Sequence, residues 1–293
     1  MSPPPLVEAA RIPHSSPARP HHGHRDDDGP AHWGLFGPES VTWKVHSDPL
    51  FGLSLLRSLL LRVLHPEALP DVFATATRVD DPWERLAWTQ RIIGVATFGN
   101  SAEAAMTGAR LRAVLMQVHG TTVEGRDYRG DDPELLCWMH ACQVASAAEV
   151  TRRGGLGLSD REHELYVREQ VRMAALWGLE PDEVPGTRAD LTRYFRSVRP
   201  QLRMSAAARS FIGAVVSPSL PEIMLLADRH RPAWAPVAGL AFSSLPAWAR
   251  TVYGSAPRSG PGSLNRAATT VALHSLRDSL RGHTDVPATP PPG

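Results

Sequence analysis

The chain has 293 residues, of which 42% are hydrophobic and 21% are charged, and its formal net charge is +1. This composition predicts a globular protein with a substantial core, and the nearly neutral balance gives no field that would favour nucleic acid or an anionic membrane. Lys44 is the only lysine, so nearly all positive charge is arginine, a skew typical of a GC-rich bacterial genome.

Both ends of the chain are expected to be disordered tails. Residues 1–30 are rich in Pro, His and Asp, residues 283–293 end in "VPATPPPG", and neither segment can bury a core. The N-terminal segment lacks the apolar stretch of a secretory signal. Cys137 and Cys142 point in different directions on one predicted helix and cannot easily bridge, so a reduced, cytoplasmic protein is expected.

Helical periodicity runs through almost everything between the tails and predicts a single all-α domain over residues 31–282. Several helix starts are marked by a capping residue or an N1 proline, at Asp81-Pro82, Asp132-Pro133 and Ser159-Asp160. Helices are predicted over residues 50–65, 82–98, 101–119, 132–152, 159–178, 187–198, 204–216, 219–230 and 264–281.

The most apolar run is "PLFGLSLLRSLLLRVLHP", which is interrupted by Arg57 and Arg62. It is too short and too charged to span a membrane, and it is predicted to form a buried helix. The chain contains no G-x-G-x-x-G, P-loop or G-x-S-x-G motif, which removes the sequence basis for the familiar nucleotide and hydrolase chemistries.

Polar side chains interrupt the apolar stripes of three predicted helices. A lone histidine on such a stripe is more often a satisfied core residue than a ligand, but helix bundles build cofactor sites from residues on facing helices. A polar group that is buried without a partner costs about 1–3 kcal/mol. These polar side chains are therefore expected to face one shared cavity rather than the apolar core. The residues predicted to border this cavity are Arg85, Thr89, Arg112, His119 and His140.

The segments "LHPEAL", "DPWERLAWTQRIIGVATFG", "ARLRAV…HG", "GRDYRGDDPELLCWMHA" and "REQVRMAALWGL" occur in an order and spacing that resemble the MpaB-like and latex-clearing-protein (rubber oxygenase) family over about residues 34 to 250. The resemblance implies an all-α protein that binds a b-type haem and cleaves carbon–carbon double bonds with dioxygen. The family's distal R-x-x-x-T pair maps onto Arg85 and Thr89. Trp88 replaces a lysine of the latex-clearing enzymes, which argues against polyisoprene as substrate.

The family's proximal haem ligand is the histidine of an R-x-x-H-x-x-x-R pattern, and this position is Leu115 here, preceded by Arg112. Leucine cannot coordinate iron. His119 is the first alternative ligand, because it is expected on the same helix and face, roughly 6 Å further along the axis. His140 is a second candidate, since the resemblance places a histidine after the same tryptophan near the pocket, and His65 is a third.

Three functions follow from this pattern. The first is a haem-dependent oxygenase or related oxidoreductase acting on a small apolar metabolite, with Arg85 and Thr89 polarising bound dioxygen or peroxide. The second is a metal-free enzyme that uses the same cavity for acid–base chemistry such as dehydration or cyclisation. The third is a non-catalytic protein that binds a hydrophobic ligand. An absorption spectrum distinguishes the first from the other two.

Overall fold

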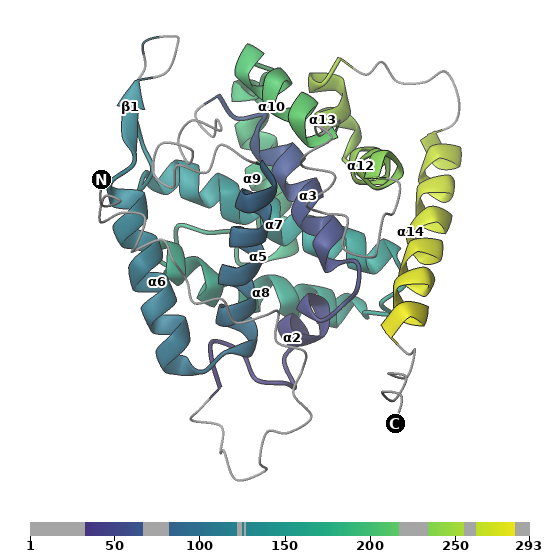
Figure 1. Cartoon of the computed structure of the whole chain (residues 1–293), viewed down its shortest axis with the longest axis horizontal. Coiled ribbons are helices and arrows are strands. Elements are labelled where there is room, and N and C mark those ends of the chain that lie inside the picture. The colour runs from purple at the N-terminus through teal and green to yellow at the C-terminus, as the bar shows by residue number, and fades with distance from the viewer. Residues whose placement is uncertain are drawn as a thin grey trace, which may run out of the picture.

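The computed structural model of the chain describes residues 33–66, 82–121, 125, 127–216, 234–254 and 262–284 (Figure 1). This part consists of helices and one two-stranded hairpin, which confirms the predicted all-α class. The predicted N-terminal tail, residues 285–293 of the predicted C-terminal tail and the predicted helix 219–230 lie outside the described residues, whereas residues 283 and 284, predicted as tail, belong to the last helix.

The helices, in chain order, are α2 (Val41–His46), α3 (Phe51–Arg62), α5 (Pro82–Phe98), α6 (Ser101–Met116), α7 (Pro133–Arg153), α8 (Asp160–Trp177), α9 (Arg188–Val198), α10 (Ala206–Val216), α12 (Trp234–Ser243), α13 (Ala247–Val252) and α14 (Gly262–Thr284). A short 3-10 turn, η2 (Arg199–Gln201), follows α9. Strands β1 (His119–Thr121) and β2 (Asp127–Arg129) pair antiparallel between α6 and α7.

The predicted capping residues act as expected at two long helices. The Asp132 side chain accepts from the backbone N–H groups of Glu134 and Leu135 at the start of α7. Ser159 and Glu162 form a reciprocal capping box at the start of α8. These interactions satisfy N–H groups that have no partner within the helix, so the helix starts could be read from the sequence.

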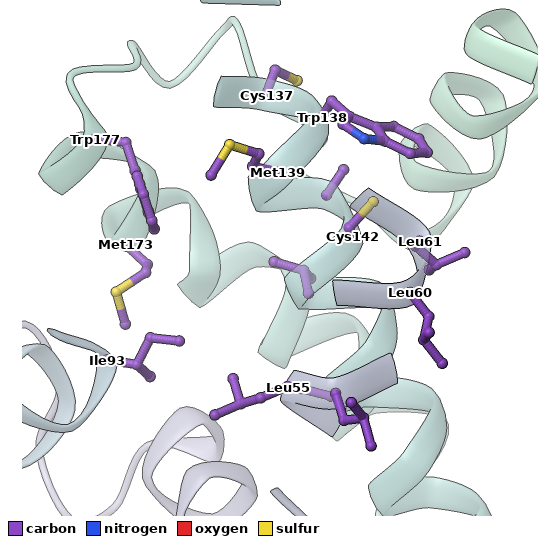
Figure 2. Close-up of a cluster of buried hydrophobic side chains, with 14 of the residues drawn as sticks. Leu55, Leu60, Leu61, Ile93, Cys137, Trp138, Met139, Cys142, Met173 and Trp177 are labelled. Atoms are coloured by element: carbon purple, nitrogen blue, oxygen red, sulfur yellow. The ribbon is translucent and has the colours of Figure 1, made fainter. Parts of the chain in front are cut away.

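The core is centred on the packing of α3 against α7 (Figure 2). Leu55, Leu60 and Leu61 of α3 belong to the same buried cluster as Trp138 and Cys142 of α7. Helix α3 is apolar on nearly all sides and is buried along most of its length, as expected of a helix inside a bundle. No helix in the described ranges combines the length and the apolar character needed to cross a bilayer.

Helix α14 is joined to this core by a buried ion pair. The Arg277 guanidinium contacts the Asp48 carboxylate between α2 and α3, and Arg277 Nη1 also donates to the Gly154 carbonyl oxygen at 3.0 Å. Both charged side chains are almost completely shielded from solvent. The last helix is therefore fixed to two segments far away in the sequence.

One departure from the predicted helices, at the end of α6, changes the candidate site. The helix ends at Met116 rather than at residue 119, and the Val118 N–H donates to the Leu115 carbonyl as the chain turns into the hairpin. The Gly130 N–H in turn donates to the Val118 carbonyl at 2.7 Å, which fixes the turn from the other strand. Three short helices, α2, α12 and α13, were not predicted from periodicity, which needs longer segments.

Candidate active site

The imidazole of His140 lies inside the bundle on the central helix α7. Its residue is 3% exposed, and burial, followed by the neighbouring Arg62 guanidinium, lowers the pKa of His140 to about 4. The ring is therefore neutral at pH 7. A neutral imidazole has a nitrogen lone pair that can bind a ligand.

Arg62, the last residue of α3, lies beside His140. Its Nε donates to the Met139 carbonyl oxygen at 3.2 Å, and its Nη2 lies 3.5 Å from Gln143 Oε1. Burial lowers the pKa of Arg62 to about 10, which leaves the guanidinium protonated at neutral pH. A permanent positive charge therefore lies against the face of α7 that carries the histidine.

Gln143 completes this buried polar group. It follows His140 by three residues, which places both side chains on one face of α7. Gln143 is 7% exposed, and its Nε2 has no hydrogen-bond partner. An amide that is buried with free N–H groups is costly unless a further molecule accepts from it. His140, Arg62 and Gln143 are named below the α3–α7 polar cluster.

Apolar side chains of α5, α7 and α8 make up the neighbouring part of the core. Figure 2 shows Met139 of α7 extending toward the side of the bundle where Met173 and Trp177 of α8 lie, with Ile93 of α5 next to them. All four residues belong to the buried core. This part of the core consists of hydrocarbon, thioether sulfur and an aromatic ring.

Helix α5 carries the two residues that the resemblance assigns to the distal side of a haem. Thr89 is buried, whereas the side chain of Arg85 lies outside what the structure describes. Between them along the helix, Trp88 packs on the core with a buried Nε1 that has no hydrogen-bond partner. Helix α5 thus presents an indole donor where the latex-clearing enzymes carry a lysine.

Arg112 has a clear local partner. Its Nη1 lies 3.4 Å from the carbonyl oxygens of both Ala175 and Leu176, in the last turn of α8. The Ala175 carbonyl also accepts from the Gly178 N–H at 3.1 Å, and a cation near the carbonyl end of a helix is favoured by the helix dipole. The observed contacts of Arg112 are therefore those of a residue that stabilises the end of α8.

Leu115 occupies the position of the family's haem ligand and is a core residue. It is 1% exposed and belongs to the main hydrophobic cluster. Its side chain is a hydrocarbon, so the residue present here does not fit an iron ligand. The described residues also hold no group of three or more His, Cys, Asp or Glu side chains arranged to bind a bare metal ion.

The geometric basis for His119 as a substitute ligand is wrong. His119 lies in strand β1, beyond the end of α6, where it is exposed and faces Arg129 in the register of the hairpin. It does not continue the helix face of Leu115, because the chain leaves the helix at Met116. His65, the third candidate, is buried with its ring 6.0 Å from that of Trp138.

The structure brings together a different set of residues from the predicted one. His140 is joined by Arg62 and Gln143, which sequence reasoning did not assign to the site. Between described residues, no hydrogen bond or ion pair joins His140 to Thr89, Arg112 or His119, so the common cavity stays a prediction. The signal for Arg62 was present in the sequence as a charge within an apolar run.

One comparison with known proteins gave a match. The sequence model of a protein family described as "ER-bound oxygenase mpaB/B'/Rubber oxygenase, catalytic domain" matches residues 43–274, which is most of the chain. No curated protein and no solved structure matches the chain significantly.

Proposed function

Because the chain belongs to the family of mpaB-type and rubber-oxygenase catalytic domains, an oxygenase-type enzyme family, we propose that it is a haem-dependent oxygenase in which His140 holds the iron. Its proposed substrate is a small apolar molecule, and the co-substrate is dioxygen or peroxide. In this proposal His140 on α7 takes the role of the family's haem-ligating histidine, whose position on α6 is Leu115 in this chain.

The observation that supports this proposal is that the imidazole of His140 is buried and neutral. A neutral imidazole is the usual nitrogen donor to haem iron, and burial together with Arg62 keeps this ring neutral over the whole physiological pH range. Of the histidines considered from the sequence, His119 is exposed, and the ring of His65 is tilted by 38° against that of Trp138, at 6.0 Å between centroids. His140 is buried and neutral at pH 7.

The chain's own residues would bind the substrate and exclude water from the proposed site. When bound, haem would provide the activation of dioxygen, which no protein side chain can perform. The apolar side chains around the α3–α7 polar cluster would hold an apolar substrate and keep bulk water out. Thr89, buried on α5, offers a hydroxyl for a polar oxygen atom, in the role that the resemblance implies.

The test is the absorption spectrum of the purified full chain after expression with added haem precursor. We expect a Soret band that His140→Ala abolishes or strongly shifts. His119→Ala is the matched control, and it should leave the spectrum unchanged because His119 is exposed on the hairpin. The opposite pattern would assign the iron to His119, and a colourless wild-type protein would refute haem dependence.

The metal-free acid–base alternative has no comparable support. A general base works best with a pKa near the operating pH, whereas the pKa of His140 is lowered to about 4. The proposed enzyme should therefore consume dioxygen or peroxide in step with substrate turnover, and a turnover without either would favour the alternative.

A further inference from the structure

Arg62 is a buried cation that lacks a counter-ion. It is 9% exposed, and none of the described residues places a carboxylate against it. Its contacts are a backbone carbonyl, which already belongs to α7, and an amide oxygen at the 3.5 Å limit of a hydrogen bond. A buried charge with only such partners among the described residues is costly, and an anionic group beside it would offset that cost.

The other buried arginines of the described core differ from Arg62 in this respect. Arg277 forms an ion pair with Asp48. Arg57 donates to Ser146 Oγ at 2.8 Å, and the carboxylate of Glu149 acts on it electrostatically and raises its pKa against the effect of burial. For Arg62 the only described group that opposes the effect of burial on its pKa is the thiol of Cys142. Among the buried arginines that the structure describes, Arg62 is therefore the candidate for binding an anionic group.

The free amide of Gln143 is a second, independent sign of a missing acceptor. Its Nε2 is buried without a partner, while its Oε1 is turned to Arg62. Two kinds of N–H donor, a guanidinium and a primary amide, therefore lie together on one side of His140. A group that satisfies both donors accepts hydrogen bonds, and negative charge on it would also offset the buried guanidinium.

We propose that Arg62 and Gln143 form a carboxylate-binding subsite beside His140, which takes the carboxylate of a bound, otherwise apolar molecule. A carboxylate fits better than a phosphate, because one guanidinium neutralises one negative charge, and a second charge would remain uncompensated in the core. The inference extends the proposed function and rests on it for the identity of the molecule. The carboxylate belongs either to the substrate, which is then a small apolar acid, or to a haem propionate.

Binding of two probe molecules to the full chain, expressed without added haem, tests for an acidic substrate. Decanoate and decan-1-ol share one alkyl chain and differ in the carboxylate, and tryptophan fluorescence reports their binding. We expect wild-type protein to prefer decanoate, and Arg62→Gln to weaken decanoate binding by about tenfold or more, since the lost hydrogen bond is charge-assisted. Decan-1-ol binding should change little.

The propionate source is tested by adding haem or haem dimethyl ester to the same preparations. If the propionate is the bound group, Arg62→Gln lowers the affinity for haem and leaves the affinity for the ester unchanged, while decanoate shows no dependence on Arg62. Arg168→Gln is the matched control for the loss of an arginine, because the Arg168 side chain is 65% exposed on α8.

Gln143→Leu keeps the proposal testable if Arg62→Gln fails to fold. It retains the contact of Arg62 with Met139 and should weaken binding of the same carboxylate by about three- to tenfold. Circular dichroism verifies the helix content of each variant. The proposal is overturned if neither decanoate nor haem binding responds to any folded variant. A wild-type protein that binds decanoate but never haem would refute the haem-dependent function and leave this subsite standing.

Discussion

The guanidinium of Arg277 and the carboxylate of Asp48 form an ion pair that solvent hardly reaches, with side-chain exposures of 4% and 0%. The pair links α14 to the turn between α2 and α3, and Arg277 also donates to Gly154 after the end of α7. Helix α14 is thereby held by charge as well as by apolar contacts such as that of Leu273.

Removing one partner of this pair should be strongly destabilising. Asp48→Asn leaves the Arg277 charge buried without a counter-ion, so we expect the free energy of unfolding to fall by about 3–5 kcal/mol in urea titrations. Asp160→Asn is the control, because its pair with Arg188 is on the surface and should contribute less than about 1 kcal/mol. Equal effects of the two substitutions would contradict a special role of the buried pair.

A histidine at position 115 should provide a new iron ligand. In the His140→Ala background we expect Leu115→His to restore a Soret band, because the resemblance places the family ligand at this position. Without haem, the same change should reduce the free energy of unfolding by about 1–3 kcal/mol, since a polar ring replaces a leucine that is 1% exposed. Leu115→Gln, which adds a polar side chain without an imidazole nitrogen or a sulfur for the iron, serves as the control. A double variant that stays colourless would contradict the expectation.

Acid should destabilise the fold through His46. Burial lowers the pKa of His46 to about 3, whereas an unfolded histidine titrates near 6.5. The unfolded state binds the proton first as the pH falls, so the free energy of unfolding decreases from about pH 6.5 down to about pH 3, by at most about 1.4 kcal/mol per pH unit. Urea titrations at pH 7 and pH 5 measure the loss, and His46→Gln should reduce it. An identical loss in this variant would show that other groups are responsible.

The end of α8 should tolerate no side chain at Gly178. This residue has a φ of +91°, and an added Cβ would lie 3.2 Å from Cδ of Arg112. We expect Gly178→Ala to reduce the free energy of unfolding by about 1 kcal/mol, because the left-handed conformation favours glycine. Gly94→Ala, in the interior of α5 with open space around its Cα, should instead stabilise the protein by about 0.5–1 kcal/mol. Thermal unfolding of both variants is the measurement.

Much of the fold could be predicted from the sequence because it depends on local signals. Helix α5 was predicted with its observed bounds, and α7 and α8 within one residue at each end. Their starts depend on capping side chains such as Asp132 and Ser159, which act within three residues of their own position. The hairpin was missed because its strands are only three residues long, too short for their alternation to be recognised in the sequence.

The candidate site was less predictable, because it depends on contacts between segments that are distant in the sequence. Leu115 and His119 share a face only if the helix continues, and the hydrogen bond from Gly130 to Val118, which closes the hairpin, cannot be read from the helix itself. Arg62 and Met139 are 77 residues apart. The arginine was visible as an irregularity in an apolar run, but its partner could not be inferred.

The contact of Arg277 with Asp48 spans 229 residues, which has a consequence for synthesis of the chain. A ribosome makes α2, α3 and α7 long before it makes α14. During that interval the Asp48 carboxylate has no guanidinium partner, and water must remain around it. The nascent chain therefore completes its core only after residue 277 has left the ribosome.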